Sequence, residues 1–185
     1  LRLPVERGLR RITKKTFHKK LQRAYVAVGF QAARISEKNF SALEVIKAIL
    51  AKGQSSRLFH EVRTKRGLAY TVGAVYEATI HFGFFALYFS ADYGNVKSIL
   101  HILFEQLALH DLREEEVDDA REFLIGSFLL ANEYTRERAD VNASWLLFGR
   151  KPADYVRGIR GVSVNDVRRV AREYFKKNHA LIITR

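Results

Sequence analysis

The sequence predicts an α+β fold with a mainly antiparallel sheet of about five strands and with helices packed on one face. β-Rich segments occur as two neighbouring pairs, 9–17 with 24–30 and 68–79 with 82–91, and each pair has a short connection that favours a hairpin. The other segments show apolar residues at helical spacing. Strands in hairpins beside segregated helices are typical of this fold class.

The first half of the chain begins with the predicted strand pair. Residues 24–30 (AYVAVGF) are β-rich and largely apolar, so we expect a central strand there, paired with residues 9–17. Ser36 is the expected N-cap of a helix that reaches about residue 51 and that Gly53 ends. A second helix should run from Ser55 or Ser56 to about residue 65, before Gly67.

Helical signals dominate the second half of the chain. Acidic residues at 114–116 suit the start of a helix because they complement its dipole. Ser163 and Asp166 have the spacing of a capping box, with Asp in place of the usual Glu. Five helices are predicted: one that starts at residue 95, one over 114–131, one over 135–148, a short one that starts at Pro152, and one from Ser163 to about Phe175. A closing strand follows over 179–184.

Positive charge is concentrated at the N-terminus. The chain of 185 residues carries a formal charge of +12, but residues 1–23 hold nine Lys or Arg and one acid, so this segment alone accounts for +8. We therefore divide the chain into a basic segment, 1–23, and one α+β domain, 24–185. The basic segment contains a linker and the first strand of the sheet, which is expected to start at residue 9. Because the excess charge lies on this one segment, we expect no nucleic-acid partner, and a basic nucleic-acid-binding domain is kept only as an alternative function.

Composition bounds the function in other ways. The chain has no cysteine, which excludes disulfides and thiolate chemistry and is compatible with a cytoplasmic location. It has no methionine, not even at position 1, so we expect a fragment or a processed product. The longest apolar runs, 82–89 and 123–131, are far shorter than the roughly 20 residues of a membrane-spanning helix.

Candidate metal ligands are scattered in this sequence. His60 and Glu61 begin like an H-E-x-x-H zinc motif, but Thr64 stands where the second histidine is needed. His101 and Glu105 are spaced i, i+4 without a third ligand. We therefore expect no metal site in this chain.

The most specific motif lies at residues 53–76, GQSSRLFHEVRTKRGLAYTVGAVY. This run resembles the C-terminal, zinc-free half of the pitrilysin or insulinase (M16) zinc metallopeptidases, of the processing-peptidase type. In that half the typical pattern is G-x-S-S-R-L-F followed by G-L-A-Y. Segments 22–30, 112–117 and 162–175 are also similar to the family, so the resemblance covers about residues 9–184.

The resemblance implies a division of labour between two halves of the same fold. The other half would carry H-x-x-E-H and the zinc cofactor, and the two halves would enclose a chamber for peptide substrates. This chain would supply Arg63 for substrate binding and Tyr70 for catalysis, would be inactive alone, and would pair with the zinc-bearing half or subunit as a homo- or heterodimer. A non-catalytic scaffold subunit of the same fold is the other alternative.

The two residue types suit these implied roles. A phenol hydroxyl can donate a hydrogen bond to the oxyanion of peptide hydrolysis, and a guanidinium offers rigid donors to peptide carbonyls. The simpler alternatives are that Arg63 binds helix-end carbonyls and that Tyr70 is a half-buried strand residue. Ser55, Ser56 and Arg57 are expected to cap and anchor the second helix.

Overall fold

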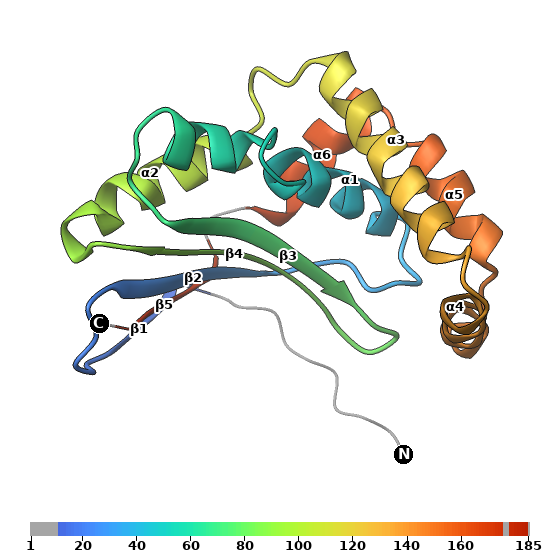
Figure 1. Cartoon of the computed structure of the whole chain (residues 1–185), viewed down its shortest axis with the longest axis horizontal. Coiled ribbons are helices and arrows are strands. Elements are labelled where there is room, and N and C mark those ends of the chain that lie inside the picture. Colours follow the sequence, from blue (N-terminus) through green and yellow to red (C-terminus); the bar gives the residue numbers. More distant parts are fainter. Residues whose placement is uncertain (1–10, 176–177, 185) are drawn as a thin grey trace.

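The structure is a computed structural model that describes residues 11–175 and 178–184. In these ranges the chain forms one five-stranded sheet with the order β1-β5-β2-β4-β3, and helices lie over one of its faces (Figure 1). All strand pairs are antiparallel except β1 with β5. The predicted α+β class, the mainly antiparallel sheet and the one-sided helical layer are confirmed.

The elements follow the predicted order closely. The strands are β1 (Thr13–Phe17), β2 (Ala24–Gln31), β3 (Thr71–Ala78), β4 (Gly83–Ala91) and β5 (Ala180–Thr184). The helices are α1 (Phe40–Ala51), the π-helix η1 (Phe59–Thr64), the 3-10 turn η2 (Tyr93–Asn95), α2 (Val96–Leu107), α3 (Glu114–Ala131), α4 (Thr135–Leu147), α5 (Pro152–Arg160) and α6 (Val164–Tyr174).

The predicted hairpin of the first two strands is wrong. β5 lies between β1 and β2, and it pairs parallel with β1 and antiparallel with β2. The sequences ALIIT and TKKTF explain this order, because the apolar strand β5 can bury Ile183 whereas the lysine-bearing β1 is fully exposed. Charged residues are well suited to an edge strand, since they discourage pairing with other chains. Residues 9 and 10 of the predicted first strand lie outside the described residues.

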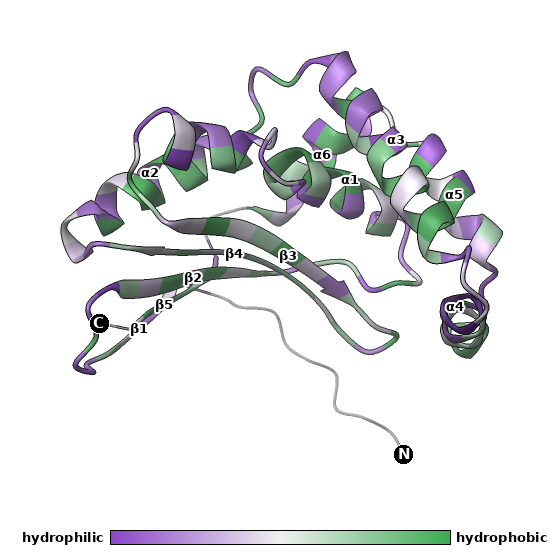
Figure 2. Cartoon of the chain, in the orientation of Figure 1, coloured by the Kyte–Doolittle hydropathy of each residue, from purple (hydrophilic) through white to green (hydrophobic). Residues whose placement is uncertain are grey.

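The predicted hairpin of β3 and β4 is confirmed, although β3 begins at Thr71 rather than 68. Phe85, Leu87 and Phe89 alternate along β4 toward the helices and are buried. Figure 2 shows hydrophobic residues on the helix sides that face the sheet. The opposite face of the sheet carries no helix in the described part of the chain (Figure 1).

The first helix begins later than predicted. Residues 36–39 form turns, α1 starts at Phe40, and the side chain of Asn39 does not cap it. The amide of Asn39 instead donates to Glu173 and to the Tyr174 hydroxyl, both at 3.3 Å, so contacts with α6 override the local capping signal of Ser36.

Two other local signals are confirmed. Ser163 and Asp166 form the capping box of α6, with Asp166 N–H donating to Ser163 Oγ at 3.1 Å. Pro152 opens α5. Within the two described ranges, no helix is both long and apolar enough to span a membrane.

A close backbone approach at the β4 start gives a stability prediction. A Cβ on Gly83 would lie 2.1 Å from the Ala33 carbonyl oxygen, which is a backbone atom and cannot move away as a flexible side chain could. Gly83→Ala should therefore lower the free energy of unfolding by about 2 kcal/mol, as overpacking does. Denaturant unfolding measures this. Gly29→Ala, where nothing lies within 4 Å, is the matched control; equal costs for both variants would contradict the argument.

Candidate functional site

The short helix before β3 carries Arg63. Leu58 and Val62 are both fully buried and fasten one side of this helix to the core. The helix has π geometry at its end, where the Lys65 N–H donates to the His60 carbonyl at 2.8 Å. Since π-turns are rare and are frequent at functional sites, this segment is a candidate site. Arg63 directly follows Val62 and is exposed.

A tight turn then leads to Tyr70. Gly67 has φ +60°, a conformation that favours glycine, and the Leu68 N–H donates back to the Val62 carbonyl at 2.9 Å. The Tyr70 N–H donates to the Ser90 carbonyl of β4 at 3.2 Å, and β3 begins at the next residue. The Tyr70 side chain is 66% exposed.

The structure brings the two predicted site residues together. The guanidinium carbon of Arg63 lies 5.5 Å from the centroid of the Tyr70 ring and 4.9 Å from that of Phe59. Both distances are within the range of cation–π attraction. Arg63 is thus held between two aromatic rings with its donors exposed, and Tyr70 is an exposed residue before the strand rather than a half-buried residue within it.

A third residue joins this pair, and the sequence reasoning did not single it out. The guanidinium carbon of Arg23 lies 5.3 Å from the Tyr70 ring centroid. Arg23 precedes β2, and the register pairs Ala24 with Ala91 and Thr71 with Ser90, so the starts of β2 and β3 meet at one end of the sheet. From the sequence Arg23 is only one of the cations in the basic segment, and the strand pairing is what brings it to Tyr70.

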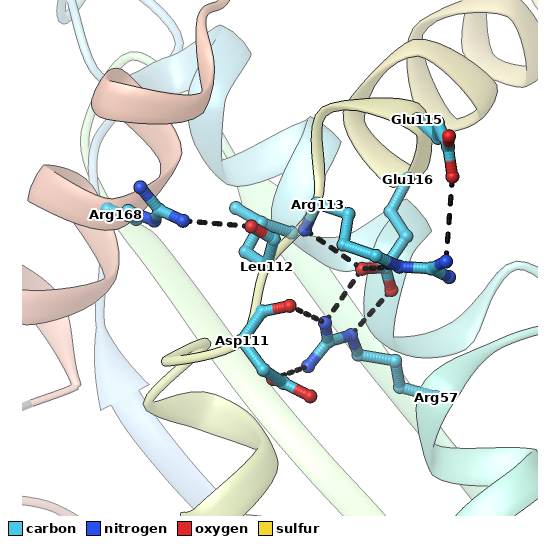
Figure 3. A network of polar contacts seen from close by, with 7 residues as sticks. All are labelled: Arg57, Asp111, Leu112, Arg113, Glu115, Glu116 and Arg168. Carbon is cyan, nitrogen blue, oxygen red and sulfur yellow. Dashed lines mark hydrogen bonds and ion pairs between the residues drawn. The ribbon is translucent and has the colours of Figure 1, made fainter.

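Arg57 anchors the helix that carries Arg63 (Figure 3). Its guanidinium donates to both carboxylate oxygens of Glu116, at 2.7 and 2.8 Å, and to Asp111 Oδ1 at 2.7 Å. The Ser56 hydroxyl donates to the Gly53 carbonyl at 2.7 Å. The predicted anchoring role of Arg57 is therefore confirmed, and it ties the helix start to α3 and to the loop before it. The predicted capping by Ser55 or Ser56 is wrong, because no side chain in the described part of the chain caps this helix.

The ion pair shifts the pKa of each partner. Hydrogen bonds to Glu116 raise the pKa of Arg57, against the opposing effect of burial. Burial by itself would raise the pKa of Glu116, but the hydrogen bonds from Arg57 and from the Arg113 backbone N–H outweigh it and lower that pKa. Arg57 and Glu116 are therefore both charged at neutral pH and hold each other in a partly buried site, with side chains 13% and 20% exposed.

The bare face of the sheet is hollowed next to Tyr70. A depression of about 320 Å³ is lined mainly by β2, β4 and the start of β3, including Tyr25, Thr71 and Tyr88. Gly73 makes room for the Tyr88 side chain, because the Tyr88 hydroxyl oxygen lies 2.7 Å from where a Cβ at position 73 would be. This hollow can receive an apolar or aromatic side chain.

The candidate metal ligands do not converge. Among the residues that the structure describes, no group of three or more His, Cys, Asp or Glu side chains could hold a metal ion. His60, His101 and Glu105 are exposed, and Glu61 pairs with Arg66 and Lys65. These residues do not fit a zinc site.

Comparisons with known proteins agree with the motif at residues 53–76. A family model described as the peptidase M16 inactive domain matches residues 4–124. An uncharacterized zinc protease of Streptomyces coelicolor is 32% identical over 171 residues, which are 89% of this chain and 37% of that protein. One of Bacillus subtilis is 25% identical over 176 residues, which are 92% of this chain and 43% of that protein. The chain thus spans about two fifths of the curated relatives it matches.

The fold also occurs among solved structures. The crystal structure of a protease from Helicobacter pylori superposes with a TM-score of 0.85 at 23% identity, covering 98% of this chain and 45% of that one. At this identity the similarity concerns the fold.

The anchoring role of Arg57 can be measured. Arg57→Gln should lower the free energy of unfolding by about 2–3 kcal/mol, because it leaves the Glu116 carboxylate partly buried without its partner. Arg113→Gln removes an exposed guanidinium from the same cluster and should cost less than about 1 kcal/mol. Denaturant titrations compare the two variants, and similar costs would argue against an anchor at Arg57.

The lowered pKa of Glu116 predicts a pH dependence. Its folded-state pKa lies below the usual 4.5, so its contribution to stability is complete above about pH 4.5 and is lost as the pH falls through the folded-state value. The stability difference between the unmodified chain and Glu116→Gln should therefore shrink between about pH 6 and about pH 3. Glu115→Gln, at an exposed neighbour, is the control and should cost little at neutral pH. A Glu116→Gln difference that does not change with pH would contradict this account.

Proposed function

The chain belongs to the M16 peptidase family, as its inactive domain, and we propose that it completes the substrate chamber of a zinc metalloendopeptidase. In this proposal a zinc-bearing half, in the same longer polypeptide or in a partner subunit, carries H-x-x-E-H and cleaves the peptide bond. This chain supplies Arg63 and Tyr70 to that reaction. The observation that carries the proposal is the exposed contact between these two side chains at the start of β3.

Tyr70 is suited to act on a peptide that lies in the chamber. Its hydroxyl is on an exposed ring at the end of the sheet, so it can reach a group on a second domain. Peptide hydrolysis develops negative charge on the former carbonyl oxygen, and an aimed O–H donor lowers the energy of that state. The cations of Arg63 and Arg23 beside the ring add a favourable positive potential there.

Arg63 is suited to hold the peptide in position. Its guanidinium lies over the rings of Phe59 and Tyr70, so the side chain is restrained before substrate arrives. A restrained guanidinium presents several N–H donors in one plane and can bind neighbouring peptide carbonyls at a small entropic cost. Lysine would keep the charge without this planar set of donors.

Zinc has no place among the described residues of this chain, since their ligand-type side chains do not converge. We therefore assign the metal to the other half of the enzyme. Zinc there would polarise the peptide carbonyl and activate water. The contribution of this chain is to bind and orient the substrate and to donate one hydrogen bond.

The alternative of a scaffold without chemistry is less well supported. A scaffold would need the buried core and the Arg57 anchor, but it would have no use for an exposed Arg63 stacked on an exposed Tyr70. Neither side chain fills the core or caps a helix through any hydrogen bond found in the described part of the chain. Exposed paired residues that do not stabilise the fold favour a functional role.

Mixing this chain with the zinc-bearing half should produce peptidase activity that neither has alone. In the mixture, Tyr70→Phe should lower kcat by roughly 100-fold and change KM much less, because the lost hydrogen bond forms only in the transition state. Steady-state kinetics with a fluorogenic peptide measure both constants.

Tyr134→Phe is the matched control, since Tyr134 is 69% exposed and lies before α4, beyond the far end of β3 (Figure 1). Its kinetics should equal those of the unmodified chain. Complex formation without hydrolysis would favour the scaffold alternative, and an unchanged kcat in Tyr70→Phe would remove Tyr70 from the reaction.

A further inference from the structure

Arg23 lies beside Tyr70 and has no acidic partner among the described residues. Some other surface arginines pair with nearby acids, as Arg34 does with Glu37 and Arg169 with Asp166. No carboxylate in the described part of the chain lies within ion-pair distance of Arg23 or Arg63. Two guanidiniums beside one tyrosine ring, with no internal counter-ion, leave an anion-binding capacity unused.

The surroundings strengthen this positive potential. Lys19 and Lys20, in the connection from β1 to β2, line a hollow at the same end of the sheet together with His18 and Tyr93. Asp92 follows β4 there and forms no ion pair with either arginine among the described contacts. Cations therefore outnumber acids at this end, and such a surface attracts anionic ligands and repels cationic ones.

The location ties this potential to the substrate. Tyr70 is within 5.5 Å, ring centroid to guanidinium carbon, of both arginines, so all three side chains face one small area. If Arg63 and Tyr70 hold the peptide bond that is cleaved, Arg23 contacts the substrate only a residue or so away from that bond. Its exposed donors fit the planar carboxylate group, which accepts two parallel hydrogen bonds from a guanidinium.

We propose that Arg23 is a specificity-determining residue that binds a carboxylate of the peptide substrate beside Tyr70. The favoured substrates are peptides with an acidic side chain, or a free terminal carboxylate, close to the cleaved bond. This inference rests on the proposed function for its link to cleavage, but the carboxylate site itself can be tested on this chain without any hydrolysis.

The test uses three dye-labelled peptides and fluorescence anisotropy at low salt. The first peptide has blocked ends and one glutamate, the second has glutamine in that place, and the third is the glutamine peptide with a free terminal carboxylate. The chain should bind the first or the third roughly fivefold more tightly than the second, as expected for a partly exposed ion pair. Which of the two binds more tightly identifies the source of the carboxylate.

Variants assign the effect to Arg23. Arg23→Gln should abolish the preference, and Arg23→Lys should keep much of it because the charge remains. Arg136→Gln is the matched control, because it removes one exposed arginine from α4, beyond the far end of β3 (Figure 1), and should keep the preference in full. Thermal unfolding of each variant verifies that the fold is intact.

Equal binding of all three peptides, or an equal loss in Arg136→Gln and Arg23→Gln, would overturn the inference. Tyr70→Phe should leave the preference for carboxylate-bearing peptides unchanged. This result would separate carboxylate binding by Arg23 from the role of the Tyr70 hydroxyl in hydrolysis. Hydrolysis by the mixed halves without any preference for a carboxylate would refute the role of Arg23 and leave the proposed function standing. A preference without hydrolysis would support the carboxylate site and refute the peptidase role.

Discussion

Burial of only one face of the sheet is the constraint on which the rest of the structure depends. Alternate residues of β2 and β4, such as Phe30 and Phe85, are buried, and both of these rings contact Phe175. The apolar residues of α1 are also buried on nearly every side of that helix. This packing satisfies the hydrophobic requirement of the domain. The other face keeps exposed Tyr25, Tyr88 and Ile182, and it is therefore available to a second layer of protein or to a peptide.

The candidate site is held in place by contacts with this core. The helix that carries Arg63 is fixed on its inner side by Leu58 and Val62 and at its start by the ion pairs of Arg57. β3 then leaves the turn at Gly67 already hydrogen-bonded to β4. Exposed side chains such as Arg63 and Tyr70 need such support, because a misplacement of about 1 Å can cost an enzyme much of its rate. In the proposed function, the described residues, which hold no metal-binding group, would supply an ordered surface to the reaction.

Local signals in the sequence predicted most elements correctly. The capping box at Ser163 and the glycines at 53 and 67 act within one helical turn, so their effects do not depend on distant residues. Two local predictions failed because remote contacts compete with them. Ser36 does not start α1, since Asn39 is engaged by α6, and the first strand does not pair with β2, since the more apolar β5 takes that place.

By itself, the sequence determined the α+β class, the family resemblance carried by residues 53–76, and Arg63 and Tyr70 as the pair to consider. Tertiary structure alone decided the strand order, the carboxylate partners of Arg57 and the presence of Arg23 beside Tyr70. The physical reason is the distance along the sequence over which each kind of interaction acts. Periodicity, capping and turn chemistry act over a few residues. These contacts join residues that are 47 apart for Arg23 and Tyr70, 59 apart for Arg57 and Glu116, and 167 apart for Thr13 and Ala180 in the pairing of β1 with β5.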